Sequence, residues 1–349
     1  MKKRIKKFFA RLGVFLLVTV IMAIMFLYGV MWVCVNGPST VFRDIFVMSV
    51  RETSAVGFLA NIFLTDEEIA EIEEKNKIKV TDEITDTSLI TIGGDNTLQE
   101  GEDDPGVVED NSQEEDDILF VDGIAIEKVN GSTFQGYMML VKDPSRVFVG
   151  AANQKYSKDT PGKTVAEMLN SYSVSIGING GGFDDPQGTG DGALPSGLVI
   201  SEGKLLYGNE NSTYEIIGFN NDNILVVGRM TGKQALDSGI RDAVVFGPTL
   251  IVNGQALSGI GTGGGLNPRT AIGQRADGTV LMLVIEGRQA NSLGASYNDI
   301  IKVMLDYGAV NAANLDGGSS SVMYYDGKLI NSNASVIGLR KMPTAFLVK

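Results

Sequence analysis

The chain has 349 residues and a formal net charge of −13, with one cysteine and no histidine. Without histidine it cannot build a Ser-His-Asp or Cys-His catalytic arrangement or the usual zinc hydrolase site, because each needs an imidazole as base or ligand. One cysteine cannot form an intramolecular disulfide. Any chemistry must therefore use carboxylates, arginines, lysines and backbone amides.

Residues 1–35 predict a basic cytoplasmic tip and a transmembrane anchor. Six basic residues precede an uncharged, mainly apolar run of 24 residues from Leu12 to Val35. At about 1.5 Å per residue this run spans about 36 Å, enough to cross ~30 Å of hydrocarbon. The positive-inside rule then predicts a single-pass protein of the cell membrane with a cytoplasmic N-terminus and an extracellular catalytic domain. A cleaved signal peptide is the alternative, but residues 36–39 offer no clear small-x-small cleavage pattern.

Residues 36–80 are predicted to form an apolar and helical stalk next to the membrane. The apolar run from Ala55 to Leu64 is too short to span a bilayer. We interpret it either as an interfacial helix on the outer leaflet or as a helix that packs on the catalytic domain or on a partner. The sequence Thr65-Asp66-Glu67-Glu68 then predicts a capped helix start.

Residues 81–117 contain fourteen acidic residues and no basic one, which predicts an acidic, disordered linker. Outside this linker the charge is nearly balanced, since residues 118–349 hold 20 acidic and 18 basic residues. The domain's charge therefore gives no indication of nucleic-acid binding.

Residues 118–349 are predicted to form the catalytic domain. One helix should begin at Thr164, with a capping box. A second should begin near Ser296 with Asp299 three residues on, bury Tyr297, Ile300, Ile301, Met304 and Leu305, and end at Gly308. Asp-Gly turns such as Asp277-Gly278 predict hairpins, so we expect an α+β fold with a mixed, largely antiparallel sheet and two or more packed helices. The clearest strand patterns cover residues 174–179, 216–220, 224–228, 243–246, 279–285 and 322–325.

Three polar, glycine-rich turns are predicted to assemble one site. Residues 314–321 place a carboxylate after an apolar run and follow it with glycines, which let a ligand approach the backbone closely. Residues 267–273 place an arginine at the mouth of another apolar run, and residues 178–184 form the third turn. The bland alternative for Asp316 is a turn-forming aspartate that caps backbone amides.

These motifs, in this order, resemble the phosphodiester glycosidase family, whose typical member is the lysosomal uncovering enzyme, an N-acetylglucosamine-1-phosphodiester alpha-N-acetylglucosaminidase. The likeness runs from about Phe120 to Lys349 and includes residues 246–254, 285–288 and 340–345. It implies a hydrolase that cleaves a glycosyl-1-phosphodiester, here in a cell-envelope glycopolymer or an exopolysaccharide.

Cleaving such a bond requires donors for the phosphate oxygens and carboxylates for the sugar chemistry. We predict that Asp316 and Glu286 supply the carboxylates and that Arg269 holds the phosphate. Ordinary structural ion pairs are the alternative for the arginines. The predicted substrate-binding residues are Asn179, Gly180, Gly181, Phe183, Thr270, Arg288, Gly317, Gly318, Ser319 and Arg340.

The resemblance also implies calcium in some relatives, and the weak candidate ligands are Asp184, Asp185 and Asp191 in an oxygen-rich loop. One departure from the family pattern is an extra glycine, Gly182, before Phe183, which puts the identity of the sugar in doubt.

Two other function classes stay open at this level. The fold can serve as a non-catalytic module for surface glycan binding or exopolysaccharide assembly, although such a module would need fewer carboxylates. Alternatively, the protein is an envelope scaffold in which the apolar run near Phe58 docks a partner protein.

Overall fold

The computed structural model describes residues 2–53, 56–76, 81–93, 119–185, 190–257, 264–335 and 338–349. It divides into two compact units, residues 1–77 and residues 78–349. We describe each unit separately.

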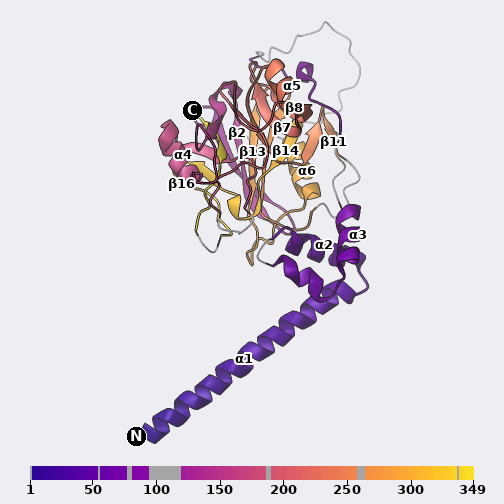
Figure 1. The fold of residues 1–349 in the computed structure, drawn as a ribbon, viewed down its shortest axis with the longest axis vertical. Helices are drawn as coiled ribbons and strands as arrows, with labels where there is room; N and C mark the ends of the chain where they lie inside the picture. The colour runs from indigo at the N-terminus through magenta and orange to yellow at the C-terminus, as the bar shows by residue number, and fades with distance from the viewer. Residues whose placement is uncertain are drawn as a thin grey trace, which may run out of the picture. The chain divides into compact units, whose positions relative to one another are not determined.

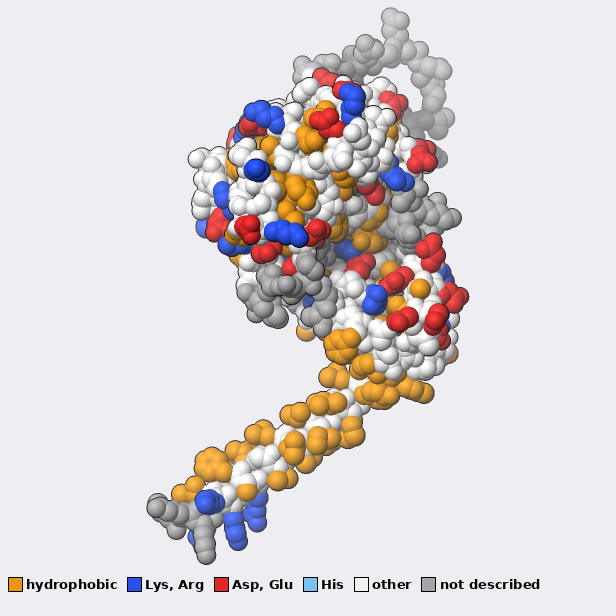
Figure 2. Space-filling model, viewed as in Figure 1, with side chains coloured by type: hydrophobic (Ala, Val, Ile, Leu, Met, Phe, Trp, Pro, Cys, Tyr) orange, Lys and Arg blue, Asp and Glu red, His pale blue; other side chains and the backbone are white. Residues whose placement is uncertain are grey.

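The first unit begins with one long apolar helix, α1 (Lys2–Asn36). Its segment Arg4–Asn36 has a mean hydropathy of 2.7, and it is long and apolar enough to cross a membrane. Figure 2 shows apolar side chains around this helix and basic ones near its N-terminal end.

Three short elements follow α1 and pack on one another. They are α2 (Thr40–Arg51), η1 (Gly57–Ile62) and α3 (Asp66–Lys75). The predicted capping box is confirmed, since Thr65 and Glu68 cap α3 reciprocally. Ala60 in η1 is buried in a small core with residues of α2 and α3, whereas Phe58 is exposed. Part of the apolar run near Phe58 is therefore covered within its own unit.

The second unit is built from three antiparallel sheets (Figure 1). The largest has seven strands in the order β1-β2-β13-β12-β14-β10-β11. The strands are β1 (Ile124–Asn130), β2 (Gln135–Val141), β10 (Thr249–Val252), β11 (Gln255–Ala256), β12 (Arg269–Arg275), β13 (Val280–Ile285) and β14 (Ala309–Leu315).

The second sheet has the order β16-β15-β4-β17-β3, and the third has the order β6-β5-β9-β7-β8. Their strands are β3 (Val147–Ala151), β4 (Ile176–Asn179), β5 (Val199–Ser201), β6 (Lys204–Tyr207), β7 (Thr213–Asn220), β8 (Leu225–Thr231), β9 (Ile240–Val245), β15 (Met323–Tyr325), β16 (Lys328–Leu329) and β17 (Thr344–Val348). The expected α+β class with largely antiparallel pairing is confirmed.

The three sheets share one apolar core. Met282 of β13, Phe346 of β17 and Phe219 of β7 belong to this cluster and are fully buried. The rings of Phe219 and Phe346 meet edge to face with centroids 6.2 Å apart. Side chains from all three sheets therefore close the domain without a disulfide.

Helices cover the outer faces of the sheets. They are α4 (Val165–Tyr172), α5 (Gly232–Asp237) and α6 (Tyr297–Asp306), with short 3-10 turns η2 (Thr87–Leu89), η3 (Pro144–Arg146) and η4 (Gly318–Ser320). The predicted capping box at Thr164 is confirmed, and the helix start predicted near Ser296 is also a capping box, formed with Asp299. In Figure 1, α4 and α6 lie on opposite sides of the unit.

One predicted core position on α6 is wrong. Leu305 is 42% exposed, whereas Val303 is buried. The apolar stripe formed by Ile300, Ile301 and Met304 faces the seven-stranded sheet, and Leu305 lies outside its buried edge.

The start of the predicted disordered linker is ordered, which corrects its boundary. Thr85 exchanges hydrogen bonds with Val227 of β8 through its amide and its hydroxyl, and Ile90 is buried. The Thr91 amide donates to the Ala276 carbonyl at 2.8 Å. The acidic composition of this segment did not predict its packing, because the contacts come from its few apolar and hydroxyl residues. Residues 94–117 lie outside the described residues.

We expect Ile90→Ala to destabilise the second unit by about 2 kcal/mol, because it deletes buried methyl groups. The neighbouring Leu89 is 43% exposed, so Leu89→Ala is a matched control that should cost much less. Urea denaturation of the full chain measures both. Equal, negligible effects of the two variants would show that the segment does not pack in solution.

Candidate functional site

Asp316 lies where β14 ends, at the entrance of a tight turn. Strand β14 is buried up to Leu315, and the Asp316 side chain is half-buried, so its carboxyl lies between the core and solvent. Gly318 adopts a φ of 62°, and its amide donates to the Pro268 carbonyl at 2.8 Å. A Cβ on Gly317 would stand 2.9 Å from the same carbonyl oxygen. The glycines thus bring the turn against the start of β12.

The environment of Asp316 favours its neutral form. Desolvation raises the pKa of Asp316 to about 6, against hydrogen bonds from the Ser320 side chain and the Gly317 amide that lower it. The carboxyl is therefore poised to exchange a proton near neutral pH, as a general acid or base requires.

A buried asparagine joins the strands that carry the predicted motifs. The Asn179 side chain donates to the Asp316 carbonyl at 2.6 Å and accepts from the Thr270 hydroxyl at 2.8 Å. Its oxygen also accepts from the Val322 amide at 3.2 Å. Asn179 and Thr270 are fully buried, so they hold the backbone of Asp316 rather than face a ligand.

The backbone amides of residues 180–182, which include the predicted substrate-binding Gly180 and Gly181, are bonded within the fold. The amides of Gly180 and Gly181 donate to the carbonyl and the hydroxyl of Thr344, and the Gly182 amide donates to the Val245 carbonyl. A Cβ at each glycine would lie within 2.8 Å of a neighbouring atom. These glycines therefore allow close packing between sheets, and their amides are already bonded.

The guanidinium of Arg269 is buried in the wall of the domain. It lies 4.1 Å from the centre of the Tyr297 ring and donates to the carbonyls of Ala295, Gly264 and Gly265. These contacts fix the loop before β12, which is a positioning role. The prediction that Arg269 contacts phosphate gains no support from this geometry.

Arg288 lies against the Asp316 turn. Its terminal nitrogens stand 3.3 and 3.5 Å from the point where a Cβ on Gly318 would be. One of them donates to the Asn267 side chain at 3.1 Å, and Arg288 itself has a φ of 58°. This uncommon backbone conformation aims a cation at the turn.

Arg340 joins two of the predicted segments. It donates to the Ser319 hydroxyl at 3.0 Å and forms an ion pair with Asp185, and its guanidinium lies 5.2 Å from the centre of the Phe183 ring. Desolvation lowers the pKa of Arg340. Phe183, predicted to bind substrate, is half-buried and packs on the apolar cluster that contains Met168 and Leu169 of α4.

Glu286 is 3% exposed and holds the loop behind the turn. Its carboxylate accepts from the Gln135 side chain at 2.9 Å and from the Ser332 amide at 2.6 Å. In that loop Asn333 donates to the carbonyls of Ser319 and Ser321. Glu286 therefore reaches the Asp316 turn through the loop at residues 331–333.

The three candidate calcium ligands do not form a cluster among the described residues, where no group of three or more acidic side chains could hold a metal ion. Asp185 pairs with Arg340, Asp191 accepts from the Ala193 amide, and Asp184 accepts from Ser196. Within the parts of the chain that the structure describes, the carboxylates of this loop thus serve local contacts.

A family comparison decides what kind of domain carries this site. The model of the phosphodiester glycosidase family matches residues 172–349. The chain belongs to this family. The match includes Asp316, Glu286 and the three arginines discussed above, and it confirms the resemblance predicted from the motifs. At the level of the family, the domain is that of hydrolases of glycosyl phosphodiesters.

Similar proteins agree with this assignment at low identity. An uncharacterised SPbeta prophage-derived protein of Bacillus subtilis is 29% identical over 203 residues, which are 54% of this chain and 29% of that protein. The mouse N-acetylglucosamine-1-phosphodiester alpha-N-acetylglucosaminidase is 24% identical over 229 residues, which cover 58% of this chain and 42% of the enzyme. The alignments thus span less than half the length of these curated relatives.

A solved structure supports the fold. The catalytic domain of the zebrafish N-acetylglucosamine-1-phosphodiester alpha-N-acetylglucosaminidase, auto-inhibited by its pro-peptide, matches with a TM-score of 0.52 and 22% identity. The match covers 64% of this chain and 81% of that chain.

Sequence reasoning missed the residues that support the site from a distance. Gln135 beside Glu286 and Asn331 behind the turn lie outside every predicted motif, and Tyr297 under Arg269 was predicted only as a core residue of its helix. No local pattern marks their role at the site, because each acts through a contact made by folding. Ser320, whose hydroxyl bonds to Asp316, lies inside the 314–321 motif, so a search of that motif for hydroxyls finds it.

We expect Asp316→Asn to stabilise the protein at pH 8 by about 2 kcal/mol relative to wild type. The pKa of Asp316 in the folded protein lies above the unfolded value of 3.8. Ionisation of Asp316 therefore lowers the free energy of unfolding of the wild type as pH rises from about 4 to about 6. Urea denaturation at pH 4 and pH 8 measures the difference between variant and wild type, which should vanish at pH 4. The exposed Asp326 provides the control Asp326→Asn, and identical behaviour of both variants would contradict the prediction.

Proposed function

We propose that this protein is a membrane-anchored hydrolase that cleaves a glycosyl-1-phosphodiester on the outer side of the membrane. The proposed substrate resembles an N-acetylglucosamine-1-phosphodiester and belongs to a cell-envelope glycopolymer or an exopolysaccharide. The observation that carries the proposal is Asp316, a half-buried carboxyl with a pKa raised to about 6, in a turn within the region that matches the family.

The leaving group explains why one carboxylate can suffice. A phosphomonoester leaves readily, so the reaction needs activation of water more than protonation of the leaving oxygen. In the proposed step, Asp316 accepts a proton from water while the water oxygen bonds to the anomeric carbon. The bond between that carbon and the phosphate oxygen breaks, and the phosphate departs with the bonding electrons.

Cations beside the turn suit the phosphate. We place Arg288, whose guanidinium lies against Gly318, at the phosphate oxygens, because a guanidinium can donate to two oxygens at once. Glu286 and Arg269 then act as positioning residues, since both are buried and bonded to backbone groups of adjoining loops. Arg340 fixes Ser319 next to the same turn.

We expect the full chain in detergent micelles to release N-acetylglucosamine from a synthetic N-acetylglucosamine 1-phosphodiester. Asp316→Asn should lower kcat about 10²–10⁴-fold, the range for removal of a general base. In wild type, kcat/KM should rise with pH through about 6 and then level, because the ionised carboxylate is the active form. Product release at several pH values measures both effects.

Variants of two arginines separate their roles. Arg288→Lys should mainly raise KM because a lysine cannot form the two-pronged contact, whereas Arg269→Lys should reduce stability through the lost carbonyl contacts. No release of sugar by the folded wild type from several glycosyl phosphodiesters would instead favour a non-catalytic glycan-binding module.

The membrane part of the proposal rests on the apolar run of α1 and on the basic residues in the N-terminal part of that helix. In a Cys34→Ser background, cysteines placed by Lys6→Cys and Asp326→Cys report the two sides. On intact expressing cells, a membrane-impermeant maleimide should label the cysteine at 326 and leave that at 6 unlabelled until the cells are lysed. Labelling at both positions in intact cells, or release of the catalytic domain into the medium, would contradict an uncleaved anchor with a cytoplasmic N-terminus.

A further inference from the structure

A cavity of about 660 Å³ opens on the second unit beside the loop that follows β4. Its lining includes Tyr156, Tyr207, Tyr214, Asp184 and Ser196, and it contains none of the residues of the Asp316 turn. The volume falls within the ~300–1,000 Å³ of small-molecule sites. A short chain of contacts connects the pocket with the turn. Asp184 lines the pocket, and the next residue, Asp185, pairs with Arg340, which donates to Ser319 of the turn.

The aromatic wall of this pocket is held in place by its neighbours. The Tyr156 hydroxyl donates to the Pro343 carbonyl at 2.8 Å, and the Tyr156 and Tyr207 rings meet edge to face with centroids 5.8 Å apart. The Asn209 amide donates to the Tyr214 hydroxyl at 2.8 Å. Gly208, with a φ of 105°, makes the turn between the two strands that carry Tyr207 and Tyr214. These rings are therefore preorganised.

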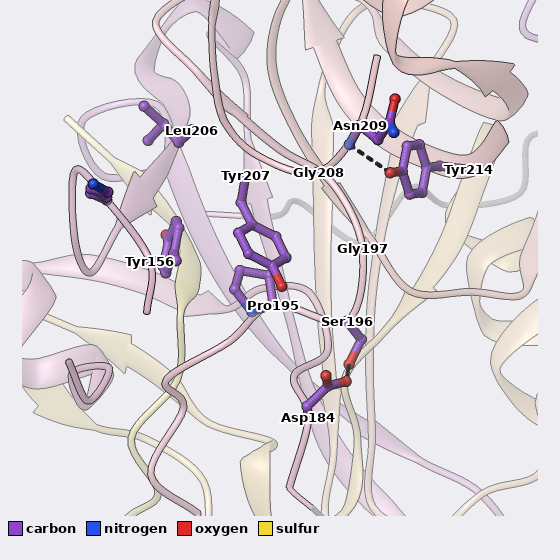
Figure 3. A pocket seen from close by; sticks show the side chains of 11 residues that line it. Tyr156, Asp184, Pro195, Ser196, Gly197, Leu206, Tyr207, Gly208, Asn209 and Tyr214 are labelled. Carbon is purple, nitrogen blue, oxygen red and sulfur yellow. Dashed lines mark hydrogen bonds between the residues drawn. The ribbon is translucent and has the colours of Figure 1, made fainter. Parts of the chain in front are cut away.

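Polar groups lie at the other side of the same space. Figure 3 shows the Tyr207 hydroxyl directed toward Pro195 and Ser196, with Asp184 next to them. Asp184 accepts from the Ser196 hydroxyl at 3.4 Å and is otherwise exposed. Among the described residues, the Tyr207 hydroxyl has no hydrogen-bond partner. Lys155 adds a cation to the lining.

We propose that this pocket binds a pyranose unit of the glycan chain, next to the unit that is cleaved. A pyranose has a face of C–H groups, which can pack on the Tyr207 ring, and hydroxyls at its rim, which can bond to Asp184 and Ser196. The Tyr207 ring therefore matches the C–H face of the sugar, and the Asp184 carboxylate and Ser196 hydroxyl match its hydroxyl rim. The proposal rests on the proposed function for the identity of the polymer, but binding at the pocket does not require catalysis.

The test uses the full chain labelled with 3-fluorotyrosine in detergent micelles, with the Tyr207 resonance assigned by its loss in Tyr207→Phe. The probes are the methyl glycosides of N-acetylglucosamine, glucose, mannose and galactose, with glycerol as a polyol that lacks a ring. We expect at least one glycoside, and not glycerol, to shift the Tyr207 fluorine resonance in a saturable way. Asp184→Asn should weaken that binding about tenfold.

The control is Asp159→Asn, another exposed carboxylate, which should leave the titration unchanged. The proposal is overturned if no glycoside shifts the Tyr207 resonance, if glycerol shifts it equally, or if Asp184→Asn binds as tightly as wild type. Comparing this titration with the turnover assay, both on the wild type, separates the pocket hypothesis from the hydrolase hypothesis. A Tyr207 shift without turnover in wild type would refute the hydrolase and keep the pocket, whereas turnover without a shift would do the reverse.

Discussion

The hydrogen bonds of the Asn179 side chain are the interaction on which the site depends. One amide group bonds to the end of β14 at Asp316, to β12 at Thr270 and to the start of β15 at Val322. Because the group is fully buried, each unmet bond would carry a desolvation cost, so the three segments are held in one arrangement. The position of the Asp316 carboxyl follows from this constraint.

Glycines make that arrangement possible because they have no Cβ atom. The Asp316 turn approaches β12 and the 180–182 segment approaches β17 and β9 so closely that a Cβ would collide with backbone or side-chain atoms. The amides of residues 180–182 are bonded within this packing. In the proposed function the phosphate is therefore bound by side chains around the turn, where Arg288 lies against Gly318 and Arg340 donates to Ser319.

Charge and polarity are divided along the chain. Fourteen acidic residues lie in residues 81–117, whereas residues 118–349 are nearly neutral. Three arginines of the domain, Arg269, Arg288 and Arg340, lie in or beside the candidate site. Two of them are anchored, Arg269 by carbonyls and an aromatic ring and Arg340 by Asp185 and Ser319. The pocket at Tyr207 is lined by none of the residues of the Asp316 turn, and in our proposal it binds a second sugar unit.

Local patterns in the sequence determined the elements whose signals are contained within a few residues. The capping boxes at Thr65, Thr164 and Ser296 depend on residues three apart, and the Asp277-Gly278 hairpin depends on one turn, so both could be predicted. The family motif likewise led to the prediction of Asp316 as a catalytic residue. Only tertiary structure decided that Arg269 and Glu286 turn inward, that Ile90 packs on the domain and that the Gly180–Gly182 amides are bonded. Each of these depends on a partner distant in sequence, which no local pattern specifies.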